Sequence, residues 1–234
     1  MANPPFVYSP PQSPFLDIVY YDNDIIVANK PSGLLTVPGK DPAHRDSLIT
    51  RINLVWPTAK IVHRLDMATS GIIILAMNKD SHRHLSRQFE TRKTKKRYFA
   101  RVFGTLAQTS GEINLPLICD WPNRPKQMVD FDNGKPAQTH YSLVQQAPDW
   151  ALVKLLPVTG RSHQLRVHML SLGHPILGDR LYASAQALTM ADRLQLHAQC
   201  LGIFHPVTNE WHNFSAPLPF DNCAPLNDES LVAL

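Results

Sequence analysis

The sequence contains no apolar run long enough to cross a membrane and too few cysteines for a disulfide framework. A membrane helix needs about 18 or more consecutive apolar residues, and the apolar runs of this chain are far shorter. The cysteines are odd in number: Cys119 and Cys200 have apolar sequence neighbours, and Cys223 lies in the C-terminal tail. Residues 1–14 lack the basic segment and apolar block of a secretory signal. We therefore expect a cytoplasmic protein with no membrane partner.

Signatures of nucleotide and metal chemistry are also missing. There is no G-x-G-x-x-G, no Walker loop and no G-x-S-x-G. His82 and His84 lie two apart and His163 and His168 five apart, whereas ligands on one helix face need a spacing of three or four, and no C-x-x-C pair is present. Glycosidase chemistry with two carboxylates lacks support, because the most informative stretch, residues 61–77, holds a single acid. We therefore expect neither a metal nor a cofactor.

Positive charge is concentrated in one part of a chain whose composition is otherwise ordinary. The 234 residues are 44% hydrophobic and carry a formal net charge of +4, and this length suits one large domain or two small ones. Between residues 81 and 103 there is one acid, Glu90, and the bases are Arg83, Arg87, Arg92, Lys93, Lys95, Lys96, Arg97 and Arg101. Such a stretch can neutralise the phosphates of a nucleic acid. A solvated helix face followed by a basic turn explains it equally well.

Residues 61–77 read IVHRLDMATSGIIILAM and place an acid beside a buried strand. The run from Ile72 to Leu75 is rich in β-branched residues and follows Gly71, which is typical of a strand buried on both faces. Asp66 then lies on the loop that leads into this strand. A carboxylate held there is rigid and partly desolvated, which suits a catalytic acid. A turn aspartate that caps backbone amides is the alternative.

The hydrophobic pattern predicts further elements around this strand. They are a strand over 24–29, a helix to residue 52 capped by Asp46 or Ser47, a helix capped by Asp80 or Ser81, a strand over 97–103, a hairpin of strands 128–131 and 137–145, a strand over 151–156, and a helix leading into a strand within 194–204. Asn133 and Gly134 predict the hairpin, because Asn-Gly adopts the positive φ angles of a type I′ turn. Tyr98 lies at the end of the basic stretch.

Residues 157–182 form a second informative stretch, with a half-buried cation on a helix. The expected helix has Ser162 as its cap, an apolar stripe of Leu165, Met169 and Leu172, and Gly173 at its end. Arg166 lies near the edge of this stripe, and a half-buried arginine needs an acidic partner.

We expect one α+β domain over residues 16–217, between a proline-rich N-terminal tail at 1–15 and a C-terminal tail at 218–234. No internal repeat is visible, and no composition shift marks a linker. The domain is compact or has two lobes around a cleft, and the oligomeric state is not readable, so a monomer is the default expectation.

Four motifs resemble the RluA family of pseudouridine synthases. They are KPSG-LLTVPG at 30–39, HRLDMATSG at 63–71, KKRYFARVFG at 95–104, and GRSHQLRVHM with GHPILGDRLY at 160–182. The resemblance runs from about residue 15 to about 217. Residues 115–139 and the short N-terminus are similar to the branch of this family with dual specificity for 23S rRNA and tRNA. The N-terminal S4 domain of many family members is not expected here.

The resemblance implies a fold with a mixed, mostly antiparallel central sheet, flanked by helices and cut by a basic active-site cleft. It also implies isomerisation of uridine in RNA, in which the N1 glycosidic bond breaks and C5 is joined to C1′ of the ribose. By this resemblance Asp66 is the catalytic aspartate, Arg166 pairs with it, and Tyr98 stacks on the uracil and helps to remove the C5 proton. Whether Asp66 attacks C1′, attacks C6 or removes a ribose proton stays open.

The resemblance also implies that the uridine is flipped out of a stem-loop before it reacts. Arg64 would enter the vacated space, and residues 83–101 with the loop 121–126 would bind the RNA backbone and loop bases. The expected substrate-binding residues are His63, Arg64, Thr69, Lys96, Arg97, Arg124, Arg161, His163 and Leu196. Leu196 would pack against the stacked tyrosine, with Leu201 as the alternative, and Lys30 would brace the 30–39 loop or be a salt-bridged surface lysine.

Two other functions remain open at the level of sequence. A sister synthase of the same family would modify a different uridine, and the loops that read RNA shape carry no legible code for the target. An RNA-binding or ribosome-assembly factor would keep the fold without the reaction, although intact Asp66, Tyr98 and Arg166 argue against it.

Overall fold

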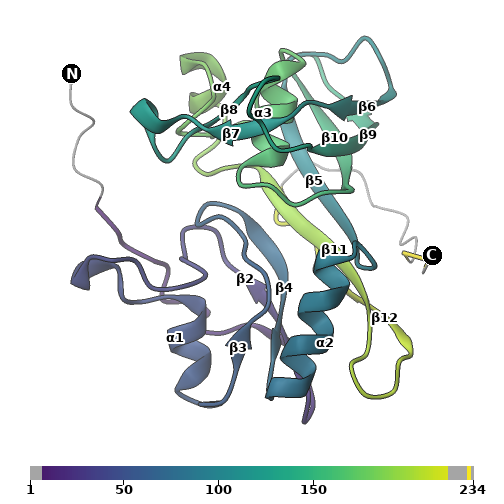
Figure 1. The fold of residues 1–234 in the computed structure, drawn as a ribbon. Coiled ribbons are helices and arrows are strands. Elements are labelled where there is room, and N and C mark those ends of the chain that lie inside the picture. The colour runs from purple at the N-terminus through teal and green to yellow at the C-terminus, as the bar shows by residue number, and fades with distance from the viewer. Residues whose placement is uncertain (1–6, 221–230, 233–234) are drawn as a thin grey trace.

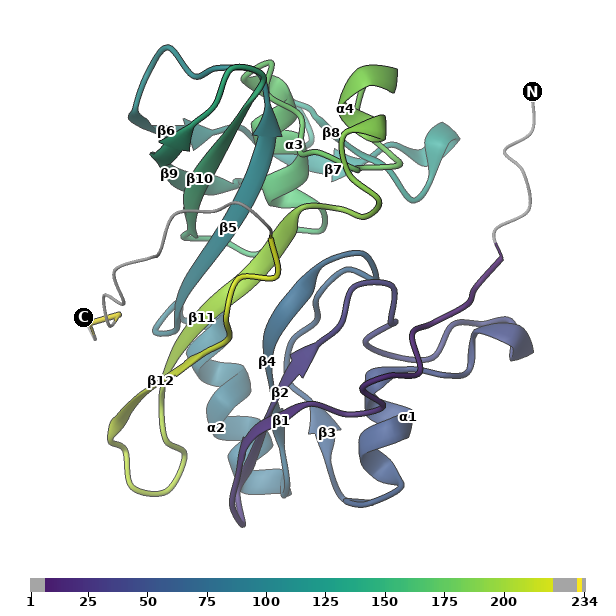
Figure 2. The same ribbon diagram turned by 180° about the vertical axis from the view of Figure 1, so that it is seen from behind.

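A ten-stranded mixed sheet forms the centre of the computed structural model, which describes residues 7–220 and 231–232 (Figures 1 and 2). The strand order is β1-β2-β4-β11-β5-β10-β9-β6, with β3 added to β4 and β12 added to β11. The strands are β1 (Ile18–Tyr21), β2 (Ile25–Lys30), β3 (Lys60–Ile61), β4 (Ser70–Ala76), β5 (Lys95–Phe103), β6 (Ser110–Asn114), β9 (Gln138–Gln146), β10 (Trp150–Pro157), β11 (Leu196–Phe204) and β12 (Trp211–Ser215). Among these strands only β4 and β11 pair in parallel. The expected mixed, mostly antiparallel sheet is confirmed.

Two lobes lie along this sheet (Figure 1). The first lobe comprises β1 to β4 with α1 (Leu48–Asn53) and α2 (Lys79–Glu90), and the second comprises β5, β6, β9 and β10 with α3 (Gln164–Ser171) and α4 (Ala185–Thr189). A separate hairpin of β7 (Leu117–Cys119) and β8 (Gln127–Val129) extends from the second lobe, and short 3-10 helices cover Pro42–His44 and Trp121–Asn123. None of the helices in the described part of the chain has the length and apolar character needed to span a membrane.

The lobes join where β4 runs beside β11. Only two residue pairs make this parallel contact, His197 with Ser70 and Ala198 with Gly71. Gly71 has φ +117°, and a Cβ built on it would lie 2.2 Å from the carbonyl oxygen of Ala198. A side chain here would therefore push β11 away from β4. The loop that carries Asp66 ends at this junction, so its position relative to both lobes is fixed.

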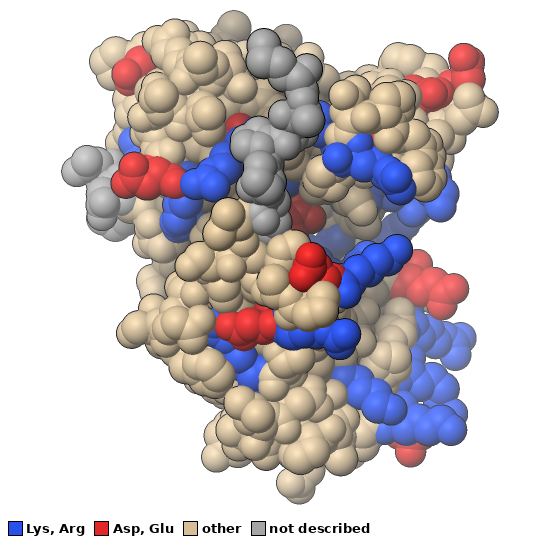
Figure 3. Space-filling model, turned by 90° about the vertical axis from the view of Figure 1, so that its left-hand side faces the viewer, with Lys and Arg blue, Asp and Glu red and all other residues tan. Residues whose placement is uncertain are grey.

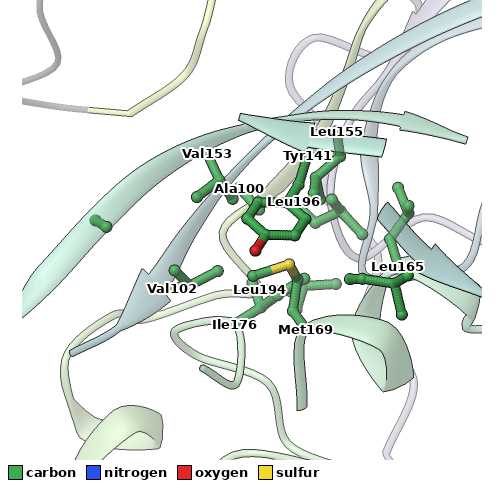
Figure 4. Close-up of a cluster of buried hydrophobic side chains, with 12 residues drawn as sticks. Ala100, Val102, Tyr141, Val153, Leu155, Leu165, Met169, Ile176, Leu194 and Leu196 are labelled. Atoms are coloured by element: carbon green, nitrogen blue, oxygen red, sulfur yellow. The ribbon is translucent and has the colours of Figure 1, made fainter. Parts of the chain in front are cut away.

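A buried apolar cluster of the second lobe lies against β5, β10 and β11 (Figure 4). Its labelled members are Ala100, Val102, Tyr141, Val153, Leu155, Leu165, Met169, Ile176, Leu194 and Leu196. Side chains in such a close-packed interior keep single rotamers. Leu165 and Leu196 belong to this cluster and also line the cavity described below, so one wall of the cavity is rigid.

Most expected elements are present with small shifts in their ends. The strands predicted over 24–29, 72–75, 97–103 and 151–156 correspond to β2, β4, β5 and β10, and β4 is buried along its whole length. The first helix is α1, capped by Ser47, whose side chain accepts the N–H of Thr50. Parts of both expected tails lie outside the described residues.

The expected caps of the next two helices are wrong. Asn78 caps α2 by accepting the N–H of Ser81, so neither Asp80 nor Ser81 is the cap. The residue before α3 is His163, in a left-handed conformation with φ +53° and without a capping side-chain bond. Ser162 therefore does not cap α3, and Leu172 follows the helix half-exposed instead of completing its apolar stripe.

The predicted hairpin and the predicted helix near residue 194 are also wrong. A tight turn does form at Gly134, whose N–H donates to the carbonyl of Asp130, but neither Asn133 nor Gly134 has the positive φ of the expected type I′ turn. The strands on its two sides diverge, however, because β8 pairs back onto β7 while β9 pairs with β10 and β6. Residues 196–204 are one strand, β11, which is buried along nearly its whole length between β4 and β5. Apolar runs of this length do not distinguish a buried helix from a buried strand.

Candidate active site

Asp66 lies on a tight turn between the lobes, beside a small cavity. The turn is closed by the N–H of Thr69, which donates to the carbonyl of Asp66 (3.1 Å), and Thr69 itself is buried. The carboxylate side chain is 29% exposed. The cavity has a volume of about 110 Å³ and is lined by Arg64, Leu65, Asp66, Thr69, Lys96, Tyr98, Pro157, Thr159, Gly160, Arg161, His163, Gln164, Leu165, Arg166 and Leu196.

The buried side chain of Lys30 supports the loop that carries Asp66. Lys30 is fully buried, and its Nζ donates to the carbonyls of Pro31 (2.9 Å), Leu34 (2.7 Å) and Met67 (3.1 Å). Burial lowers its pKa to about 7, although the charge of Asp66 opposes this shift. The expectation of a salt-bridged surface lysine is wrong, and the alternative of a brace agrees with the geometry: backbone carbonyls take the place of a carboxylate.

Arg166 is held by a carboxylate that the sequence analysis does not identify. Its Nε and Nη2 donate to the two oxygens of Asp179 (2.8 and 2.7 Å). Its Nη1 lies 3.5 Å from Asp66 Oδ2, a longer contact. Both Arg166 and Asp179 are buried. The expected contact between Arg166 and Asp66 is therefore present, but the bidentate pair with Asp179 is what orients the guanidinium toward Asp66.

Arg166 remains a cation in this setting. Burial disfavours its charged form, but the hydrogen bond and charge of Asp179, together with the charge of Asp66, outweigh burial and raise the pKa of Arg166. The only sequence signal for Asp179 is chemical. A buried guanidinium has five N–H donors, more than one partly exposed carboxylate can satisfy.

Tyr98 and Leu196 come from neighbouring strands and face the same cavity. On β5, Tyr98 lies opposite Ala198 of β11. Burial is the main cause that raises the pKa of its phenol, and the negative charge of Asp66 adds to the shift. The phenol is therefore protonated at neutral pH. Leu196 lines the cavity, whereas Leu201 packs in a different apolar cluster, in the first lobe. Of these two aliphatic candidates, the geometry selects Leu196.

The polar rim of the cavity comes mainly from the loop before α3. The N–H of Arg161 donates to Gln164 Oε1 (3.0 Å), and its Nε donates to the carbonyl of Pro136 (3.1 Å). Lys96 Nζ donates to the carbonyl of Thr159 (3.1 Å), and burial lowers the pKa of this lysine to about 8. Arg64 is exposed at the cavity edge. The rim thus offers several cationic groups to an anion.

Three expected substrate-binding residues lie outside the cavity lining. His63 stacks on Phe89 (4.4 Å between ring centres), its Nε2 accepts the N–H of Ile74 (3.1 Å), and burial lowers its pKa to about 3. Arg97 is buried with its Nε bound to Gln199 (2.8 Å). His63 and Arg97 therefore each have a side-chain nitrogen bound within the protein, and neither lines the cavity.

Arg124, the third of these residues, lies on the tip of the β7–β8 hairpin. Its guanidinium carbon is 4.7 Å from the ring centre of Trp121, and the Trp121 side chain is 65% exposed. A basic group stacked on an open aromatic ring gives a flat surface on which a base can pack.

The basic stretch predicted from the sequence is only partly a surface. Arg83, Arg87, Arg92 and Lys93 are exposed on α2 and the turn after it, and Figure 3 shows Lys and Arg side chains gathered beside the hollow between the two lobes. Arg101 instead lies over the ring of Trp150 (4.0 Å), on the far part of β5. The predicted RNA-binding stretch therefore ends before Arg101.

One group in the described part of the chain has the spacing of metal ligands, and it lies away from the cavity. It comprises Asp22, Asp24 and His205. Asp22 accepts bonds from the N–H groups of Asp24 and Ile25, and also bonds with Tyr20 and His205. These bonds account for the cluster as part of the β1–β2 turn.

Sequence and structure comparisons find relatives of this chain. A sequence profile described as RNA pseudouridylate synthase matches residues 24–171. The chain is 58% identical to the dual-specificity RNA pseudouridine synthase RluA of Salmonella typhimurium and equally to that of Escherichia coli, and 53% identical to that of Pasteurella multocida. Each of these alignments covers 214 residues, which are 91% of this chain and 98% of the relative. The solved structure of human RNA pseudouridylate synthase domain containing 1 aligns with a TM-score of 0.74 and 28% identity, over 94% of this chain and 87% of its own. The solved structure of human RNA pseudouridylate synthase domain containing 4 aligns with a TM-score of 0.70 and 27% identity, over 87% of this chain and 88% of its own.

Proposed function

Because the chain belongs to the RNA pseudouridylate synthase family, we propose that it isomerises uridine to pseudouridine in stem-loops of both 23S rRNA and tRNA, with Asp66 as the catalytic carboxylate. The observation that carries the assignment of Asp66 is its position at the cavity beside Arg166, Tyr98 and Leu196. The dual target rests on relatives that are named dual-specificity synthases and on the resemblance at residues 115–139.

The position of Asp66 at a cavity between the two lobes supports base flipping. A uridine stacked inside a stem cannot reach a carboxylate between two protein lobes, so the nucleotide has to leave the stack, at a cost of a few kcal/mol that is smaller for a loop base. The extruded uracil would lie between Tyr98 and Leu196, with its ribose toward Asp66. Arg64, exposed at the cavity edge, would enter the space that the base leaves in the RNA.

The reaction is an isomerisation, so its atoms balance without a second substrate. The bond between N1 and C1′ breaks, a bond between C5 and C1′ forms, C5 loses a proton and N1 gains one. Asp66 acts as the ionised nucleophile or base, next to the fixed cation of Arg166. Tyr98 stacks on the ring as a protonated phenol; it can accept the C5 proton only after giving up its own, because burial raises its pKa.

Cations around the cavity would hold the phosphates on either side of the flipped nucleotide. Lys96 and Arg161 line the cavity, and the exposed bases of α2 continue this surface outward. A phosphate near Lys96 would favour its charged form and so oppose the effect of burial on its pKa. Contacts of this kind fix the position of the RNA and leave sequence to be read from the shape of the loop.

The tip of the β7–β8 hairpin would stack on an RNA base, which makes Trp121→Ala a test of substrate binding. Loss of one base-stacking ring costs about 1–3 kcal/mol, so KM for an RNA hairpin is expected to rise by roughly 5-fold to 150-fold with kcat little changed. Steady-state kinetics at fixed salt measure both values. Tyr21→Ala is the matched control, because it removes an equally open ring (61% exposed) from β1, and an unchanged KM in Trp121→Ala would exclude the hairpin tip from the RNA interface.

The proposed function itself is tested with the purified chain and two RNA hairpins, one from 23S rRNA and one from a tRNA anticodon arm, each tritiated at uridine C5. Tritium release from both, with pseudouridine at one loop position of each, is the expected result, and a loop-free duplex serves as control. Release from only one hairpin would identify a sister synthase with a single target. Binding of both RNAs without release from either would identify a non-catalytic RNA-binding factor.

A further inference from the structure

Tyr182 connects the β7–β8 hairpin by hydrogen bonds to His163, whose ring lies beside Asp66. The backbone N–H of Gln127, the first residue of β8, donates to the hydroxyl oxygen of Tyr182 (2.8 Å). The same oxygen lies 2.7 Å from Nδ1 of His163. The other ring nitrogen of His163, Nε2, lies 3.9 Å from Asp66 Oδ2. A single imidazole therefore connects Tyr182 with the proposed catalytic carboxylate.

Only one arrangement of the protons gives the hydroxyl proton of Tyr182 an acceptor among these groups. The hydroxyl oxygen of Tyr182 already accepts the N–H of Gln127, so its own proton remains to be donated. Burial raises the pKa of Tyr182 to about 12, and burial lowers the pKa of His163 although Asp66 opposes this. At neutral pH the phenol is thus protonated and the imidazole neutral. The phenol donates to Nδ1, and the proton of the imidazole lies on Nε2, facing Asp66.

The backbone around His163 is built to keep the ring in this place. His163 has a left-handed φ of +53°, which is uncommon for a residue with a side chain and persists where the surroundings impose it. Asp179, which holds Arg166, also accepts the N–H groups of Leu181 (2.9 Å) and Tyr182 (3.3 Å). The guanidinium carbon of Arg166 lies 5.0 Å from the ring centre of Tyr182. Residues 179–182 therefore position both cavity residues that face Asp66, His163 just before α3 and Arg166 within it.

We propose that Tyr182 is a positioning residue of the active site: its hydroxyl holds His163 in the Nε2–H tautomer, and that N–H faces the Asp66 carboxylate with its positive end, at an N–O distance of 3.9 Å. Tyr182 is not among the residues that line the cavity, so it acts through His163 and not on the RNA. The kinetic consequences rest on the proposed function. The tautomer of His163 does not rest on the proposed function, because it is a property of the enzyme without RNA.

The tautomer of His163 in the RNA-free enzyme is the first test. Long-range nitrogen–carbon correlation spectra of the histidine rings, assigned by their loss in His163→Asn, are expected to show a neutral Nε2–H ring in the wild type and a mixture of tautomers in Tyr182→Phe. Tyr20→Phe is the matched control, because it removes a hydroxyl that bonds to Asp22 (2.8 Å) at the β1–β2 turn. A wild-type ring protonated on Nδ1 would overturn the proposal without any variant.

A double-variant cycle in kinetics is the second test. Tyr182→Phe is expected to lower kcat roughly tenfold with KM unchanged within about twofold, and Tyr20→Phe is expected to change neither. His163→Asn suits the left-handed backbone, because asparagine adopts that conformation readily. In the His163→Asn background Tyr182→Phe is expected to lower kcat by less than about twofold.

Equal losses of kcat with and without His163 would overturn the proposal, as would a loss expressed only in KM. A failure of the proposed function would be distinguishable from a failure of this proposal. If the wild type forms no pseudouridine in either RNA hairpin, the isomerase assignment is wrong, and the tautomer spectra still decide whether Tyr182 controls His163.

Discussion

Asp66→Asn is expected to fold and to bind RNA hairpins as the wild type does, but to lose kcat by roughly a thousandfold or more. The amide has nearly the shape of the carboxylate and still offers an oxygen to Arg166 Nη1, which lies 3.5 Å from Oδ2 in the wild type. It has no negative charge with which to attack carbon or accept a proton. The change therefore removes the reaction and little else, and the free energy of unfolding is expected to change by less than about 1 kcal/mol.

Tritium release from uridine C5 measures the loss, and urea unfolding with an RNA-binding titration measures what is kept. Asp80→Asn is a matched control, because it neutralises a carboxylate that is 86% exposed and paired only at the surface with Arg83, where ion pairs contribute little. Turnover by Asp66→Asn at more than about a tenth of the wild-type rate would show that the essential carboxylate lies elsewhere.

The sequence alone predicts the residues whose positions are set by local structure. Asp66 is locatable because a buried strand, visible in the sequence as an apolar run after Gly71, follows it. Tyr98 is locatable because the alternation of β5 places it on the face that carries Ala100 and Val102. For Tyr98 the period of the strand fixes the direction of the side chain.

Residues whose role depends on contacts distant in the sequence are not predictable in this way. Asp179 reaches Arg166, and Tyr182 reaches His163, because the chain after α3 folds back over the helix, and no periodicity encodes that path. Lys30 illustrates the same limit: only the tertiary structure brings the carbonyls of Leu34 and Met67 to its ammonium group.

Turn chemistry is likewise necessary but insufficient for strand pairing. Asn133 and Gly134 do occupy a tight turn, although without the positive φ angles of type I′, and the strands beside that turn belong to different sheets. Pairing of β8 with β7 places Gln127 where its N–H reaches Tyr182. The departure from the simple hairpin thus connects the proposed RNA-binding tip with the active site, and a functional contact of this kind is a place where local rules are expected to fail.

Arg166→Met is expected to abolish measurable turnover and to lower the free energy of unfolding by about 3–5 kcal/mol. The stability loss comes mainly from Asp179, whose side chain is 1% exposed and would be left as an unpaired buried charge. Asp66 is partly exposed and contributes less. Methionine fills most of the volume of the arginine stem, so the loss of packing is small.

The double variant Arg166→Met with Asp179→Asn separates stability from catalysis. Asparagine removes the unpaired charge and keeps an oxygen for the N–H groups of Leu181 and Tyr182, so roughly 1–3 kcal/mol of stability is expected to return. Turnover is not expected to return, because no cation then faces Asp66. Urea unfolding and tritium release on the same samples measure the two effects. Recovery of both together would show that Arg166 serves only the fold, and a stable, active Arg166→Met would show that Asp179 does not need its partner.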